Sequence, residues 1–187
     1  MVAVAGNAAA AEILKRSRID IVDQTLAGAV QPYHFAQGQP LAAAERHLAN
    51  CAASSERLAF ERLHKAADEI RHGKAAIAGC AILMASGRAL PELSKILGSH
   101  PLIHTAEGEF FRQAFWRATE RLKIQVTGFR ERDLKQQARK VLGDAAEVDR
   151  TIATLGKVIG PPWTADQRRA TLAALLLLTR QQSPAQA

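Results

Sequence analysis

A long run of apolar residues at helical spacing, over residues 41–72, constrains the fold of this 187-residue chain more than any other feature. Charged side chains fill most of the positions between the apolar ones. Apolar residues that recur every three or four positions form one face of an amphipathic helix. Gly73 follows the run, and Arg71 and His72 lie in its last turn, where positive charge stabilises a helix. We therefore predict one long helix over residues 41–72.

Most of the remaining chain also has helical patterns. Prolines near the start, glycines after the end and apolar residues at helical spacing mark these segments. We predict helices over residues 10–16, 91–97, 101–123, 131–142, 145–159 and 164–181. In the last of them, residues 172–178 are apolar almost all round, which is typical of a deeply buried helix or of a subunit contact. Residues 31–40 contain prolines and a glycine and are expected to form a loop.

Two segments between the helices have the composition of strands. Residues 75–85 are almost wholly apolar, and residues 124–129 include β-branched and aromatic side chains. A strand that is followed by helices and then by a second strand implies a crossover, which joins parallel strands. Residues 18–30 fit a third strand or a helix. We therefore predict a helix-rich α/β fold, with a small mixed or parallel sheet of about three strands flanked by long helices. Because residues 75–85 also fit a helix, an all-α bundle is the alternative.

Length and composition favour a single domain. We expect it to span residues 1–187, with residues 1–10 and 183–187 as loose tails. Aromatic residues make up 5% of the chain while alanine is abundant, which favours helices that pack through small side chains. The formal net charge of +7 permits contact with nucleic acid or another polyanion. Nucleic-acid binding is not the favoured interpretation, because the basic residues are spread over several helices.

Several features indicate a cytoplasmic protein that does not enter a membrane. The alanine-rich N-terminus lacks the basic leader and the long apolar run of a signal peptide. The apolar block around residues 175–178 is too short to span a bilayer. Cys51 and Cys80 lack a Cys-x-x-Cys spacing and lie among apolar residues, which is typical of free thiols in a reducing compartment.

The residues most suited to chemistry are concentrated at the start of the helix predicted over residues 101–123. His100, His104 and Glu107 follow one another at spacings of four and three, so they share one face of a helix. Glu107 also falls in the middle of the apolar stripe of this helix. A carboxylate on a buried face costs several kcal/mol unless it is paired or hydrogen-bonded. Its position there therefore needs an explanation.

Two explanations remain open. In the functional one, His104 and Glu107 are a catalytic pair, and His100, His104 and Glu107 bind a divalent metal ion. In the structural one, Glu107 is buried against an arginine or against backbone N–H groups of a neighbouring loop, and His104 packs beside it. The His-Glu-x-x-His motif of zinc proteases is absent, so the spacing alone does not identify a metal.

The functional explanation predicts a metal-assisted hydrolase or a nuclease-like enzyme. Tyr33 and His34, on the predicted loop, are candidates for substrate binding, together with Arg88 and Arg130. Glycine-rich phosphate loops and the Gly-x-Ser-x-Gly motif are absent. The alternative is a non-catalytic binding or oligomerisation module, which forms a homo-oligomer through the helix over residues 164–181 and contacts nucleic acid through its basic surface.

Overall fold

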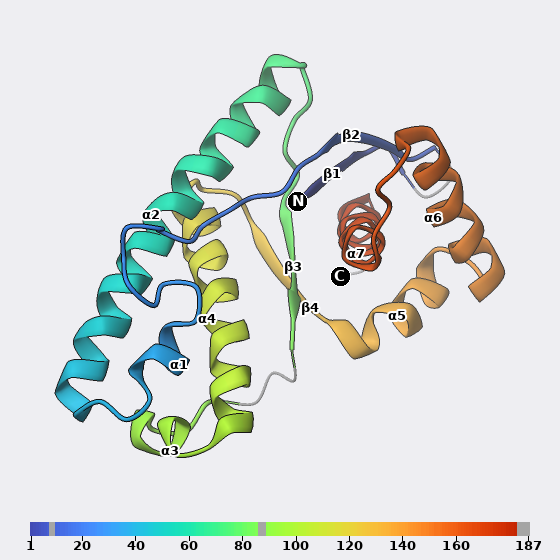
Figure 1. The fold of residues 1–187 in the computed structure, drawn as a ribbon. Coiled ribbons are helices and arrows are strands. Elements are labelled where there is room, and N and C mark those ends of the chain that lie inside the picture. Colours follow the sequence, from blue (N-terminus) through green and yellow to red (C-terminus); the bar gives the residue numbers. More distant parts are fainter. Residues whose placement is uncertain (8–9, 86–88, 183–187) are drawn as a thin grey trace, which may run out of the picture. The chain divides into compact units, whose positions relative to one another are not determined.

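The fold is a helix-rich mixture of α-helices and β-strands, as the sequence predicts. The structure is a computed structural model, which describes residues 1–7, 10–85 and 89–182. The strands are β1 (Val2–Ala5), β2 (Glu12–Arg16), β3 (Cys80–Met84) and β4 (Val126–Arg130). The helices are α1 (Pro32–Ala36), α2 (Leu41–His72), α3 (Leu93–Leu97), α4 (His100–Arg121), α5 (Leu134–Val141), α6 (Ala145–Ile159) and α7 (Ala165–Gln182) (Figure 1). A 3-10 turn at Glu131–Asp133 joins β4 to α5.

Among the described residues, the strands form two separate two-stranded sheets rather than one sheet of three strands. Strands β3 and β4 run parallel, with Cys80 opposite Val126 and Met84 opposite Arg130. This confirms the parallel pairing that the crossover predicts. Strands β1 and β2 are antiparallel.

The N-terminal segment differs from the prediction. Residues 2–5, expected within a loose tail, form β1, and residues 12–16, expected within a short helix, form β2. Val4 and Ile13 of these strands pack against a hydrophobic core whose buried residues lie between positions 129 and 177 of the sequence. Local helical preference in the alanine-rich start is therefore outweighed by strand pairing and burial, which no local pattern reveals.

Two further segments also depart from expectation. Residues 18–23 are irregular and residues 24–30 form turns, instead of a strand or a helix. There, the carboxylate of Asp23 accepts hydrogen bonds from the backbone N–H and the hydroxyl of Thr25, and from the hydroxyl of Ser54. Such local side-chain bonds compete with regular structure. The predicted loop over residues 31–40 contains the short helix α1.

Contacts divide the chain into two compact units. Unit 1 consists of Met1–Arg18, Ala66–Met84 and the chain from Ile124 onward, and unit 2 consists of Ile19–Lys65 and Ala85–Lys123. The single domain expected over residues 1–187 stays a prediction. In the part of the chain that the structure describes, no helix combines the length and the apolar character needed to cross a membrane.

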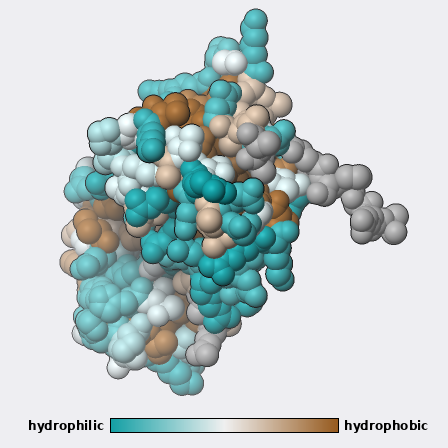
Figure 2. Space-filling model, turned by 90° about the vertical axis from the view of Figure 1, so that its right-hand side faces the viewer, coloured by the Kyte–Doolittle hydropathy of each residue, from teal (hydrophilic) through white to brown (hydrophobic). Residues whose placement is uncertain are grey.

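Unit 1 is built around the leucines of α7. Leu172, Leu175, Leu176 and Leu177 are all buried in one core with Phe129 of β4. The almost wholly apolar character of this helix is therefore explained by burial inside its own chain. The side of the molecule that carries α6 is mostly hydrophilic, with separate hydrophobic areas (Figure 2).

Gly156 gives a test of packing in unit 1. A β-carbon built on this residue of α6 would lie 2.4 Å from Cδ1 and Nε1 of Trp163, far inside contact distance. In an open helix, a glycine-to-alanine change stabilises by about 1 kcal/mol. Here overpacking against the indole costs about 1–3 kcal/mol and reverses the sign. We expect Gly156→Ala to lower the free energy of unfolding in urea titrations.

Gly98 provides the matched control for that measurement. A β-carbon there meets its nearest neighbour at an ordinary 3.5 Å, so Gly98→Ala should change the stability by less than about 0.5 kcal/mol. A Gly156→Ala variant that is more stable than the wild type would show that the indole moves aside without cost.

Candidate metal centre

The site in unit 2 begins with a carboxylate that caps a helix from another part of the chain. Pro32 occupies the start of α1, and Gln31, its N-cap residue, makes no side-chain capping bond. Instead, Oε1 of Glu107 on α4 accepts the backbone N–H of Tyr33 at 2.9 Å and that of His34 at 3.1 Å. The first N–H groups of a helix lack partners within the helix, so this carboxylate satisfies two of them.

The same carboxylate oxygen also holds an imidazole. Nδ1 of His34 lies 3.2 Å from Oε1 of Glu107, and Glu107 is only 9% exposed. When Nδ1 carries the hydrogen and donates it to the carboxylate, the lone pair of His34 is on Nε2. A carboxylate behind a histidine in this way is a common arrangement around metal ions, because it fixes the tautomer and the orientation of the ring.

Three imidazoles meet at this point. His34 from α1 and His100 and His104 from α4 each offer a ring nitrogen, and these nitrogens lie within 4.8 Å of one another. The ring centroids are 4.4 Å apart for His100 and His104, and 4.8 Å apart for His34 and His104. His34 is half-buried, whereas the other two rings are exposed. The cluster thus combines one imidazole that Glu107 holds in place with two exposed imidazoles.

This donor set fits a divalent transition metal. Imidazole nitrogens bind Zn²⁺ at about 2.0–2.1 Å in a tetrahedral arrangement, which places the nitrogens about 3.3 Å apart. The ring nitrogens now lie within 4.8 Å of one another, and rotation of the exposed rings of His100 and His104 would bring them to the shorter distance that a bound ion needs. Three protein ligands leave a fourth position open, as in catalytic zinc sites.

Oε2 of Glu107 is a further unusual feature. Among the described residues, it is one of two buried side-chain nitrogen or oxygen atoms without a hydrogen-bond partner. Leaving a buried carboxylate oxygen unpaired costs about 1–3 kcal/mol or more. Oε2 of Glu107 is therefore a hydrogen-bond acceptor that the cap of α1 does not use.

No family model matches this chain, and neither the curated proteins nor the solved structures include a significant match. The site is accordingly interpreted from its own geometry.

Two of the three predicted metal ligands, His100 and His104, lie in the imidazole cluster. The carboxylate of Glu107, predicted as a ligand, bonds to His34 and to backbone N–H groups. His34, predicted to bind substrate, supplies the third imidazole. The pairing of His104 with Glu107 as catalytic residues stays a prediction. The meeting of α1 with α4 is not evident from the sequence, since 65 or more residues separate His34 from His100 and His104.

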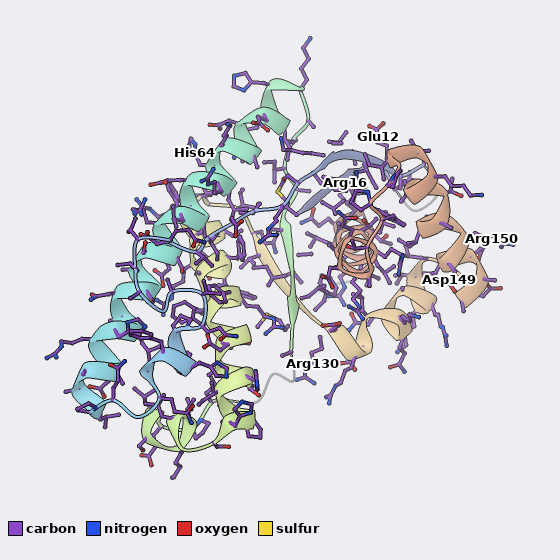
Figure 3. The ribbon with its side chains drawn as sticks, in the orientation of Figure 1. Glu12, Arg16, His64, Arg130, Asp149 and Arg150 are labelled. Atoms are coloured by element: carbon purple, nitrogen blue, oxygen red, sulfur yellow. The ribbon has the colours of Figure 1, made fainter. Side chains whose placement is uncertain are left out.

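The other predicted substrate-binding residues have different positions. Tyr33 is half-buried in unit 2, with its ring edge-on to Phe110 at 6.2 Å. Burial, and then the charge of Glu107, raise the pKa of the Tyr33 hydroxyl above its ordinary value, so the hydroxyl stays protonated further into the alkaline range. Arg130 is exposed at the end of β4 in unit 1 (Figure 3). Arg88 lies outside the described residues.

A pocket of about 230 Å³ lies beside Tyr33 in unit 2. Apolar and charged side chains both line it: Tyr33, Leu90, Phe110, Glu56, Glu109 and Arg117. Glu56 and Arg117 form an ion pair at 2.6 Å across part of this lining. Tyr33 thus contributes its ring to the pocket and its N–H to the carboxylate that orients His34.

Proposed function

We propose that the protein is a metal-dependent hydrolase whose divalent ion is held by His34, His100 and His104. The observation that carries the proposal is the convergence of three imidazoles, one of which is hydrogen-bonded at Nδ1 to a buried carboxylate. Structural histidines do not need this arrangement, because exposed rings such as those of His100 and His104 are satisfied by water. A cation is the ligand that three neighbouring lone pairs favour.

The residues of the site would have distinct roles. Glu107 positions His34, and His100 and His104 complete the ligand set from one face of α4. A divalent ion bound there would supply a nucleophilic hydroxide near neutral pH and polarise the scissile bond. The pocket beside Tyr33 offers space for the organic part of an ester, amide or phosphoester substrate.

Metal binding and activity are tested together. We expect the purified protein to bind about one Zn²⁺ or Mn²⁺ per chain in calorimetric titrations, in agreement with elemental analysis after dialysis. Chromogenic carboxyl esters, phosphomonoesters and phosphodiesters then serve as substrates, with the ion removed by chelation and restored. Hydrolysis that follows the metal content supports the proposal, and a chain that binds no divalent ion at micromolar concentrations contradicts it.

His72 is the matched control for that experiment. Its ring is exposed at the end of α2, and its Nδ1 bonds the carbonyl of Asp68 in the same helix. His72→Ala should therefore leave both the metal stoichiometry and the activity unchanged. Equal loss of binding in this variant would indicate non-specific coordination by surface histidines.

The second candidate, an assembly module that dimerises through the helix at residues 164–181, has weaker support. The leucines of α7 are buried in the core of unit 1, so their apolar surface is already covered within the chain. Light scattering distinguishes the two functions, because the hydrolase does not require a dimer. We propose the cytoplasm as the location of the protein, since Cys51 and Cys80 do not form a disulfide with each other.

A further inference from the structure

The exposed face of α5 in unit 1 is strongly basic. Lys135, Arg139 and Lys140 are all exposed, and none of them has an ion-pair partner in the described part of the chain. Leu134 and Ala138, on the opposite side of the helix, are buried in the core of unit 1. This short helix therefore presents cations outward, while Leu134 and Ala138 are buried and Val141, at its end, stays 45% exposed.

Helix stability does not account for all of these charges. Arg139 and Lys140 lie in the last turn, where the helix dipole favours cations by about 0.3–1 kcal/mol. Lys135 lies in the first turn, where the dipole disfavours a cation. It is also four residues before Arg139, and like charges at this spacing repel each other by about 0.2–0.5 kcal/mol. A ligand that carries negative charge would relieve this repulsion.

The residues before α5 extend the basic surface. Arg130, at the end of β4, is exposed without a charged partner among the described residues (Figure 3). Arg132 is also exposed and lies beside Asp133. The nearby acid Glu131 is neutralised by Arg169 of α7 at 3.1 Å. The excess of basic over acidic residues in the chain is concentrated in unit 1.

We propose that the exposed face of α5 binds the phosphate backbone of double-stranded DNA. Lys135 and Arg139 are separated by about 6 Å along the helix axis, which lets both contact neighbouring phosphates. A surface helix fits the B-form major groove, about 12 Å wide, whereas the narrow major groove of A-form RNA does not admit it. A lipid surface is disfavoured because, of the apolar residues of α5, only Val141 is exposed, which is too little apolar area for insertion.

This inference does not rest on the proposed hydrolase activity, and it is tested by binding alone. The probe is a fluorescein-labelled DNA duplex of about 20 base pairs, followed by anisotropy over a series of salt concentrations. The test variant is Lys135→Gln/Arg139→Gln/Lys140→Gln. The control, Arg46→Gln/Arg62→Gln/Lys65→Gln, removes three exposed cations from α2 and changes the net charge equally.

We expect the wild type to bind the duplex with a micromolar dissociation constant at about 50 mM salt. The α5 variant should bind at least about tenfold more weakly, and its slope of log affinity against log salt should be smaller by about 2 to 3. The α2 control should stay within about twofold of the wild type. Circular dichroism should show equal melting temperatures for all three proteins, because the substituted residues are exposed.

Three results would overturn this inference. Absence of duplex binding by the wild type at 50 mM salt would exclude a DNA surface. Equal weakening in the α5 and α2 variants would show that the total charge, not this face, determines binding. Single-stranded RNA and vesicles with about 30% phosphatidylserine are compared with the duplex at the same probe concentration. Tighter binding to either of them would assign the basic face to another polyanion.

Discussion

Replacing His34 by alanine is expected to lower the affinity for zinc by about 100-fold or more. Loss of an outer residue that only orients a ligand commonly costs 10- to 100-fold, so loss of the ligand itself should cost at least the upper end of that range. His34 is the half-buried imidazole of the three and the one that Glu107 holds in place. Its removal also takes away the link between α1 and the exposed histidines of α4.

Competition titration with a chromogenic zinc chelator measures this loss. The His100→Ala and His104→Ala variants should show losses of similar size, because each removes one of three ligands. His47 is the control, since its ring lies against Phe35 and Cys51 and is outside the cluster. If His34→Ala binds zinc as tightly as His47→Ala does, the imidazole cluster is not the metal site.

The sequence alone predicts the long helices and the parallel strand pair well. The helix over residues 41–72 coincides with α2, and that over residues 101–123 nearly coincides with α4. These segments are long, and their apolar periodicity repeats over many turns. The parallel pairing of β3 and β4 follows from chain connectivity, which the order of the elements already contains.

The short N-terminal elements β1, β2 and α1 were not predicted, because their conformation depends on distant contacts. Strand β2 is held by β1 and by the core around α7, although its own residues fit a helix. Helix α1 depends on a capping carboxylate from α4. A capping acceptor that lies 74 residues away cannot be recognised in a local sequence pattern.

The candidate site shows the same limit in chemical terms. A buried carboxylate on α4 is evident from the helical wheel, and Glu107 is indeed buried. The partner of that carboxylate is not evident, because nothing in the spacing of residues 100–107 indicates His34. The structural explanation has a direct counterpart, since Glu107 accepts bonds from the backbone N–H groups of residues 33 and 34, and also from the imidazole of His34. The functional explanation stays a prediction.

Substitutions of Glu107 separate these two roles. In Glu107→Gln, the amide oxygen remains able to accept the N–H groups of Tyr33 and His34, so the cap of α1 is retained. The charge that strengthens the hydrogen bond to His34 is lost. We expect zinc affinity to fall by about tenfold and hydrolysis to fall by about 10- to 100-fold, while the stability changes by less than about 1 kcal/mol.

In Glu107→Leu, both roles are removed. Two backbone N–H groups at the start of α1 lose their acceptor, at about 1–3 kcal/mol each if they stay buried, and removal of a buried charge offsets part of this cost. We therefore expect a net loss of about 2–4 kcal/mol in the free energy of unfolding of unit 2, beside a 10- to 100-fold loss of zinc affinity. Urea titrations and chelator competition measure the two effects independently.

Glu109→Gln is the matched control, because Glu109 lies two residues further on α4 and, within the described residues, forms an ion pair with Arg112 at a long 3.9 Å. It should leave both the zinc affinity and the stability nearly unchanged, as expected for a weak ion pair near the surface. The decisive comparison is between the affinities of Glu107→Gln and Glu109→Gln. Equal affinities, together with a large loss of stability in Glu107→Leu, would reduce Glu107 to a cap for α1 and remove the carboxylate from the proposed metal centre.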